Sequence, residues 1–564
     1  MMFKTRIAQL LAGALTEEGI DAEEIKLLLE IPPNPTLGDY ALPCFGLAKR
    51  LRMAPNKIAA QLAEAIAEDA WLAKVEVVGG YLNLFLEPSC YIAEVLGAVL
   101  TQGNRYGSGE EEGNIVIDFS SPNIAKPFSI GHLPSTVIGH SLARIYRHLG
   151  FNVVRINHLG DWGTQFGKLM VAYHRWGEDQ AIETKGIKEL LRLYVKYHQV
   201  AEEDPELDNE ARAWFKGLED GDAEAVRLWE WFRALSLQEF ERVYRRMGIE
   251  FDSYLGESFY NDKMDEVLKT IIEAGIATAS EGALVVDVGD DIPPCLLKKS
   301  DGATLYATRD ITAAIYRWNQ WKFVKSLYVV GVTQSLHFDQ VFRVLNLLGH
   351  HWAQRCQHVP FGTILFGDEA MSTRRGNVIF LEDVLEEAVT RIRTVIAARN
   401  PDLADPDGVA KQVGIGAVIF NALAHSRIKD TEFDWEKVIS LEGDSGPYVQ
   451  YAYARGRSVL AKAEETDEAG FAPQALTDPE ALAVIRLLER FPEVVRGAAE
   501  KDEPSLIARY CLDLAAAFNT FYHARRILGV DDTTQTARLA LVRGVCQVLE
   551  IGLYLLGLEA PEEM

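Results

Sequence analysis

The chain has 564 residues, of which 48% are hydrophobic and 25% are charged, and its formal net charge is −25. This length exceeds what one hydrophobic core supports, so we expect about three or four domains, and the apolar content is ordinary for a soluble protein. No run of residues approaches the ~20 apolar positions that a membrane span needs, so we expect no membrane partner.

The negative charge, taken alone, argues against a nucleic-acid partner, because Lys and Arg supply much of the affinity for phosphates. Net charge is a sum, however, whereas binding is local. Three groups of basic residues are candidate patches, although such a group alone is more often a solvated helix face: Lys49, Arg50 and Arg52; Arg455, Arg457 and Lys462; Arg525 and Arg526.

The six cysteines are widely spaced and form no close pairs of the kind that bind zinc or carry out redox chemistry. We therefore expect no zinc, and a reduced cytoplasmic protein. The N-terminal segment has a short apolar stretch that Gln9 interrupts, which favours an amphipathic helix over a signal peptide.

Residues 1–110 have the pattern of a small α/β domain. After the N-terminal helix and a turn-rich stretch, Val75–Leu86 alternates in polarity around Gly79 and Gly80. This pattern predicts a β-hairpin.

The next elements predict a parallel sheet. Ile115–Phe119 is a short apolar run, Ser135–Leu149 has apolar residues at helical spacing, and Asn152–Ile156 is rich in β-branched residues. Strand, helix and strand in this order form a βαβ crossover, and such units build parallel sheets. A doubly wound sheet binds its ligand at the carboxyl ends of the strands, where the strand order reverses.

The region of about 185–250 is rich in Leu, Arg, Glu and Trp at helical spacing and predicts a helical insertion. Strand-like composition returns at Ala283–Val288 and Ser326–Val330, and from about Pro401 the chain is mostly helical. The expected fold class is α/β, with three parts: a small α/β domain over 1–110, a doubly wound parallel (Rossmann-type) domain with the insertion over 111–400, and an all-α helix bundle over 401–564.

Gly131 and His132 lie between the first predicted strand and helix of the sheet. A glycine lacks a Cβ, so a nucleotide can approach the backbone closely, and the free amides at a helix start bind phosphate oxygens. This arrangement indicates ATP chemistry. For an isolated Gly-His pair, the alternative is an ordinary tight turn with a surface histidine.

The segment DFSSPNIAKPFSIGHLPS, which begins at Asp118, resembles the signature of class I aminoacyl-tRNA synthetases, and its flanks resemble the arginyl-tRNA synthetase family. Further blocks follow in that family's order and span nearly the whole chain: NHLGDWGTQFG, YLGES, LYATRDITAAIYR, MSTRRGNV and FDWEKVISLEGDSGPYVQYAYAR. Any one block matches by chance more easily than all of them in order.

The resemblance implies a nucleotide site with catalytic and ATP-binding residues in two segments: Lys126, Ser129, Gly131 and His132; Met371, Ser372, Arg374 and Arg375. Two positions depart from the family pattern, since Ser129 replaces a common histidine and Pro134 a common arginine. The second segment also lacks its usual second lysine, and Lys126 is the candidate for the missing charge. The alternatives are a plain basic surface loop and a solvated lysine.

The resemblance also implies an arginine pocket. A guanidinium is a planar cation with five donors, so a selective pocket needs carboxylates and an aromatic wall. Tyr306 and Asp310 meet this need and share one face if their segment is helical; the alternative is a core tyrosine beside a solvated aspartate. The other expected arginine-binding residues are Asp118, Glu257, Asn123, Gln334 and His337.

For function, the resemblance implies ligation of arginine to its tRNA through arginyl-adenylate, with transfer to the 2'-hydroxyl of the terminal adenosine. ATP would arrive with Mg²⁺, activation would need tRNA, and the enzyme would be a cytoplasmic monomer. The expected tRNA contacts are Tyr448, Tyr451 and Met564, with the N-terminal domain at the tRNA elbow. The alternatives are a non-catalytic tRNA-binding protein and a cysteinyl-type enzyme, whose zinc ligands are absent from this sequence.

Overall fold

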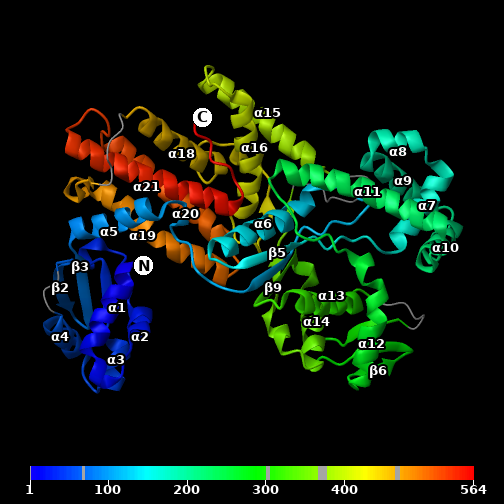
Figure 1. The fold of residues 1–564 in the computed structure, drawn as a ribbon, viewed down its shortest axis with the longest axis horizontal. Coiled ribbons are helices and arrows are strands. Elements are labelled where there is room, and N and C mark those ends of the chain that lie inside the picture. The colour runs from blue at the N-terminus through cyan, green and yellow to red at the C-terminus, as the bar shows by residue number, and fades with distance from the viewer. Residues whose placement is uncertain (1, 67–69, 300–304, 366–377, 464–469) are drawn as a thin grey trace.

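The computed structural model describes residues 2–66, 70–299, 305–365, 378–463 and 470–564. Figure 1 places the N-terminal domain at one end and the helical C-terminal bundle above it, with the central parallel sheet beside the bundle. The helical insertion and a smaller α/β lobe extend from the other side of the sheet. This arrangement has the three parts that the sequence predicts.

The N-terminal domain is an antiparallel sheet covered by helices. Its three strands lie in the order β1-β3-β2, and Gly79 adopts a left-handed φ of 61° in the turn between β2 and β3, which confirms the predicted hairpin. The strands are β1 (Tyr40–Pro43), β2 (Leu72–Val78) and β3 (Tyr81–Leu86). The helices are α1 (Met2–Ala14), α2 (Ala22–Leu28), α3 (Phe45–Leu51), α4 (Pro55–Ala65) and α5 (Pro88–Gln102).

The central sheet has four parallel strands in the order β10-β9-β4-β5. They are β4 (Asn114–Asp118), β5 (Asn152–Ile156), β9 (Lys325–Gly331) and β10 (Cys356–Phe361). The chain adds β5 on one side of β4 and the later strands on the other, so the strand order reverses between β4 and β9. The doubly wound fold is therefore confirmed, and a ligand site is expected at the carboxyl ends of these two strands.

Each face of the sheet packs on different helices. Ile115 and Ile117 point into the core that includes α6 (Leu133–His148), whereas Val116 points into a second core with α13 (Tyr306–Trp321) and α14 (Ser335–Leu347). Because side chains alternate along a strand, Asp118 at the end of β4 lies on the α13 side. That alternation decides which helix meets this carboxylate.

Close packing of α6 on the sheet depends on one glycine. A Cβ at Gly139 would lie 2.2 Å from Cγ of Phe119, which directly follows β4. Only a residue without a side chain lets the helix approach this closely. The start of α6 is thereby held against the end of β4.

The insertion predicted over about 185–250 is helical and contains α9 (Ile187–Ala201), α10 (Glu206–Asp220) and α11 (Ala223–Arg246). Two further helices, α7 (Thr164–Trp176) and α8 (Asp179–Lys185), directly precede it and pack with it. Helix α11 runs from the insertion back toward the sheet (Figure 1). The smaller lobe then adds α12 (Met264–Glu273) and the antiparallel strands β6 (Ala277–Ser280), β7 (Ala283–Val286) and β8 (Cys295–Lys298).

The C-terminal part is a helix bundle, preceded by one short strand pair. Strand β11 (Ile364–Leu365) pairs with β12 (Thr431–Glu432), so the region after 401 contains a strand that the sequence analysis does not predict. Its two residues carry too little pattern to be recognised without their partner. The helices are α15 (Leu381–Arg399), α16 (Pro406–Leu423), α17 (Trp435–Val438), α18 (Gly446–Ala461), α19 (Pro479–Glu500), α20 (Ser505–Ala524) and α21 (Asp532–Leu556).

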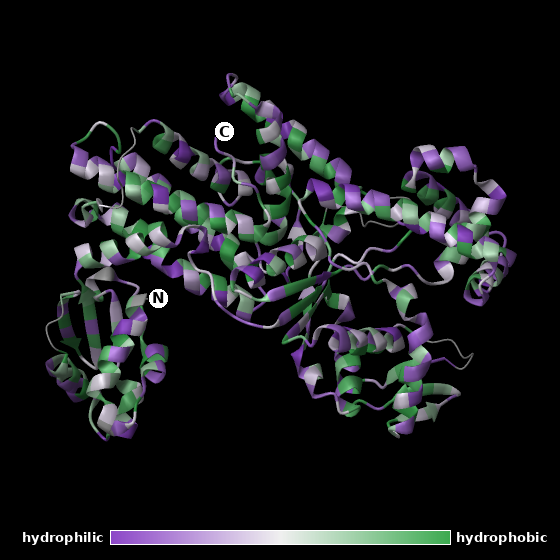
Figure 2. Cartoon of the chain, in the orientation of Figure 1, coloured by the Kyte–Doolittle hydropathy of each residue, from purple (hydrophilic) through white to green (hydrophobic). Residues whose placement is uncertain are grey.

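Helix α21 corrects one expectation from the sequence. By length and composition it is apolar enough to cross a membrane, but 78% of its apolar 18-residue stretch is buried inside the protein. Figure 2 shows many hydrophobic residues along this helix, interspersed with hydrophilic ones. Burial against α18, α19 and α20 accounts for the apolar sequence.

Candidate active site

The loop after β4 has a strained backbone. Ser120, Ser121 and Ala125 have φ values of 69°, 42° and 62°, in the left-handed region that non-glycine residues rarely adopt. Helix α11 supports this loop, since the hydroxyls of Ser120 and Tyr244 lie 2.7 Å apart and the Ala125 amide donates to Ser236 Oγ at 2.9 Å. Such conformations persist where surrounding contacts hold them, and they concentrate at functional sites.

The strained loop leads into the predicted nucleotide segment. Ser129 precedes a short 3₁₀ helix, η4 (Ile130–His132), in which Gly131 is exposed, and α6 follows directly. The Ser129 amide donates to Nδ1 of His132 at 3.1 Å. Nδ1 also lies 3.3 Å from the Ser129 carbonyl oxygen, so both backbone polar groups of Ser129 contact this ring nitrogen.

His132 is neutral in this position. Burial lowers its pKa to about 4, and the nearby Lys126 adds to the lowering, against a hydrogen bond with the Ser129 backbone that raises it. At neutral pH the ring therefore has no charge and keeps one N–H donor. The segment combines an exposed glycine, a neutral donor and an adjacent lysine at a helix start.

Met371, Ser372, Arg374 and Arg375 lie outside the described residues. The chain that directly follows their segment does contact the nucleotide segment. The Ile130 amide donates to the Ile379 carbonyl at 3.0 Å, and the Leu381 amide donates to the Phe128 carbonyl at 3.0 Å.

Asp118 is held in a buried ion pair with Arg317 of α13. Nη2 of Arg317 lies 2.7 Å from Oδ2 of Asp118, and Ser121 Oγ donates to Oδ1 at 2.8 Å. Burial alone would lower the pKa of Arg317, but the Asp118 carboxylate raises it. The structure thus gives Asp118 an internal guanidinium partner, which the sequence analysis does not identify.

Asp310 lies between two histidines. Its Oδ2 is 2.6 Å from Nε2 of His337 on α14, and its Oδ1 is 3.9 Å from Nε2 of His158, which follows β5. Burial would raise the pKa of Asp310, but the His337 hydrogen bond, the two histidines and Arg317 lower it. The carboxylate is therefore ionised at neutral pH and fixed in orientation.

Glu257 lies at the start of a 3₁₀ helix, η5 (Glu257–Lys263), with Oε1 at 3.6 Å from Nη1 of Arg309. Burial raises its pKa to about 7, and the charges of Asp310 and Asp161 add to this effect, against lowering by Arg309. Glu257 is the carboxyl group whose charge changes near neutral pH.

Helix α13 brings these groups together. Tyr306 and Asp310 stand one helical turn apart, as the spacing predicts, and the Tyr306 side chain is 61% exposed at the start of the helix. Asn123 and Gln334 are exposed at the carboxyl ends of β4 and β9. Asp118, Glu257, Tyr306, Asp310 and His337 therefore form one cluster at the switch point, and Asn123 and Gln334 lie at the adjoining strand ends.

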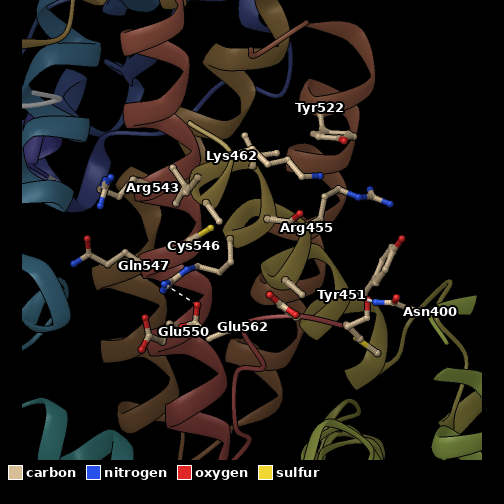
Figure 3. A pocket seen from close by; sticks show the side chains of 18 of the residues that line it. Asn400, Tyr451, Arg455, Lys462, Tyr522, Arg543, Cys546, Gln547, Glu550 and Glu562 are labelled. Atoms are coloured by element: carbon tan, nitrogen blue, oxygen red, sulfur yellow. Dashed lines mark hydrogen bonds and ion pairs between the residues drawn. The ribbon is translucent and has the colours of Figure 1, made fainter. Parts of the chain in front are cut away.

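A second candidate site is a cavity of about 1110 Å³ between the C-terminal helices, shown in Figure 3. Arg455 lies between two tyrosine rings, 4.8 Å from the centroid of Tyr451 and 5.1 Å from that of Tyr522. Met564 lines the same cavity, and its carbonyl accepts from Asn400 Nδ2 at 3.5 Å. Tyr448 lies elsewhere on α18, where Asn519 Nδ2 donates to its hydroxyl at 3.1 Å.

Within the described ranges there is no group of three His, Cys, Asp or Glu side chains arranged to hold a metal ion. All six cysteines are free.

Three family models match consecutive parts of this chain. Residues 95–435 match the model of tRNA synthetases class I (R), catalytic domain, residues 449–564 match the DALR anticodon binding domain, and residues 2–86 match the arginyl tRNA synthetase N-terminal domain. The fold is thus that of a class I tRNA synthetase.

Full-length relatives narrow the class to one family. The chain is 51% identical to the arginine–tRNA ligase of Enterococcus faecalis and 48% identical to that of Halothermothrix orenii, each over 100% of both chains. The solved Thermus thermophilus arginyl-tRNA synthetase is 27% identical with a TM-score of 0.85, covering 99% of each chain. The chain belongs to the arginyl-tRNA synthetase family.

Proposed function

We propose that the protein ligates L-arginine to its cognate tRNA. Arginine and ATP form arginyl-adenylate and pyrophosphate, and the arginyl group then passes to the 2'-hydroxyl of the terminal adenosine of the tRNA, which releases AMP. The observation that carries this proposal is the cluster of Glu257, Asp310 and Tyr306, whose ionisable groups influence one another, at the sheet edge from which β4 leads into the helix-start segment. Full-length similarity to arginine–tRNA ligases supports it.

The first step needs no general base, because the arginine carboxylate is already ionised when it attacks the α-phosphate. Catalysis then comes from positioning and from donors that meet the charge on the phosphates. In this proposal Gly131 allows close approach of the nucleotide, and the neutral His132 ring donates a hydrogen bond to it. Ser129 supplies a hydroxyl donor and Lys126 a positive charge. Mg²⁺ enters as the ATP complex.

Met371, Ser372, Arg374 and Arg375 are proposed to bind the ATP phosphates and the leaving pyrophosphate. Their support is the sequence motif, together with the contact between residues 379–381 and the nucleotide segment.

The guanidinium of arginine is proposed to bind Asp310 and Glu257, with Tyr306 as an aromatic wall. His337 fixes the orientation of Asp310 through a hydrogen bond. Asp118 is proposed to add to the negative charge of the pocket, where it is paired with Arg317. Asn123 and Gln334 are proposed to bind the substrate ammonium and carboxylate groups, which agrees with their exposure at the strand ends.

The cavity of Figure 3 is proposed to bind tRNA bases. Two tyrosines and an arginine in contact offer stacking surfaces for unpaired bases, and Tyr451 and Met564 line it. Tyr448, which lies on α18 outside the lining of this cavity, is proposed as a further tRNA contact. We also propose that the enzyme is a cytoplasmic monomer and that activation needs bound tRNA.

Aminoacylation with pure tRNA tests the activity. We expect arginine to be charged, citrulline to be rejected because it lacks the positive charge, and pyrophosphate exchange to be negligible without tRNA. Binding of tRNA without charging would favour a non-catalytic protein instead. Charging of citrulline at the rate of arginine would contradict the acidic pocket.

The pocket itself is tested by Asp310→Asn, which we expect to lower kcat/KM for arginine by about 10- to 100-fold, since a charge-assisted contact is lost. The matched control is Asp339→Asn on α14, where the aspartate pairs with Arg343 at the surface. Equal effects of the two variants would count against the pocket.

A further inference from the structure

Asp161 is a fully buried carboxylate outside the proposed arginine pocket. Its Oδ1 accepts from the Ser258 amide at 2.8 Å, and its Oδ2 accepts from Ser258 Oγ at 2.9 Å. Gly256 packs against the same group, where a Cβ would lie 2.6 Å from both carboxylate oxygens. The turn that carries Glu257 therefore rests on Asp161.

The same carboxylate is tied to the insertion. Arg233 of α11 donates from Nε to Oδ2 at 3.0 Å, and Trp229 Nε1 of the same helix donates to the Asp161 carbonyl at 2.8 Å. A buried carboxylate is costly unless it is paired and hydrogen-bonded, so these contacts stabilise each other. One side chain thus joins α11 to the turn at 256–258.

Glu257 has no such direct tie to α11 among the described contacts. Its amide donates to the Leu159 carbonyl at 2.9 Å, the Trp162 backbone hydrogen-bonds to its carboxylate, and Arg309 lies 3.6 Å away. The direction of its side chain therefore depends on how the turn sits on the segment 159–162.

We propose that Asp161 is a positioning residue that aligns Glu257 with the arginine guanidinium and couples this alignment to helix α11. The inference rests on the proposed function, in which Glu257 binds arginine. A shift of about 1 Å in such a contact is enough to cost a large part of its effect. Asp161 does not touch the substrate and acts through Glu257.

The test is Asp161→Asn in the full-length enzyme. The amide places an NH₂ group against the donors of Arg233 or Ser258, so we expect the arginine KM to rise about 10- to 100-fold while the ATP KM stays within about twofold. Arg227→Gln is the matched control, because Arg227 lies on the same helix in an exposed pair with Glu224. A purely structural role would instead lower thermal stability and change both KM values.

A second signature is the pH profile. The charged groups facing Glu257 are Arg309, Asp310 and Asp161, and Asp161 helps to raise its pKa. Removing that charge lowers the pKa, so the acid limb of the arginine KM profile is expected to move to lower pH in Asp161→Asn. If the acid limb of the arginine KM profile lies at the same pH in Asp161→Asn as in the wild type, the proposed coupling between Asp161 and Glu257 is overturned.

Two further variants test the inference if Asp161→Asn fails to fold or if Glu257 does not bind arginine. Ser258→Ala removes one hydrogen bond and is expected to raise the arginine KM about 3- to 10-fold. The double variant Glu257→Gln/Asp161→Asn should exceed Glu257→Gln by less than about twofold, because both act through one contact. If Glu257→Gln is impaired but Asp161→Asn and Ser258→Ala keep the wild-type arginine KM, this inference alone is overturned. If Glu257→Gln is not impaired, the proposed role of Glu257 is overturned as well.

Discussion

Arginine binding is expected to weaken by about tenfold between pH 8 and pH 6 through the protonation of Glu257. Burial, with Asp310 and Asp161, raises the pKa of this carboxyl group to about 7. The ionised form attracts the guanidinium, so binding is strongest above the pKa and is lost as the pH falls through it. The arginine side chain itself stays charged throughout this range.

The magnitude follows from the ionised fraction. With a pKa of about 7, that fraction is about 0.9 at pH 8 and about 0.1 at pH 6, which corresponds to about tenfold in apparent affinity, or about 1.4 kcal/mol. Asp310 does not contribute to this step, since burial, which would raise its pKa, is outweighed by His337 and His158, which lower it.

The assay is the arginine KM for aminoacylation across this range at saturating ATP and tRNA. Glu257→Gln removes the titrating group and should give a higher but flatter KM profile. The reasoning is refuted if the wild-type arginine KM is constant between pH 6 and pH 8, or if Glu257→Gln keeps the wild-type slope.

Three other perturbations give defined outcomes. Gly139→Ala places a Cβ 2.2 Å from a phenylalanine ring and should destabilise the protein by about 1–3 kcal/mol in thermal unfolding, whereas Gly497→Ala, with open space around its Cβ, should not destabilise it. Arg317→Met leaves Asp118 as a buried unpaired charge and should cost about 3–5 kcal/mol in denaturant unfolding; a smaller loss than in Gly139→Ala would argue against the pair. His132→Gln retains a hydrogen-bond donor and should therefore keep a lower ATP KM than His132→Ala. Because the pKa of His132 is about 4, the pH dependence of the ATP KM between pH 6 and pH 8 should be the same in the wild type and in both variants.

The elements that the sequence predicts well are those with local periodicity. Helix α6, the strand at Asn152–Ile156 and the hairpin around Gly79 carry their pattern within a few residues. The strand pair β11–β12 has two residues on each side, and its pairing depends on segments far apart in the chain, so no local pattern predicts it. The burial of α21 likewise depends on its neighbours in the bundle and not on its own hydropathy.

The sequence alone determined which residue types were available and in what order: a glycine and histidine before a helix, acids and a tyrosine in one helical segment, and motifs in the order of one synthetase family. The tertiary structure decided how these groups are paired. It pairs Asp118 with Arg317, places Asp310 between His337 and His158, and raises the pKa of Glu257 to about 7. The physical reason is that burial and distance set the charge and direction of a carboxylate, and both arise only when segments such as β4, α11, α13 and α14 meet.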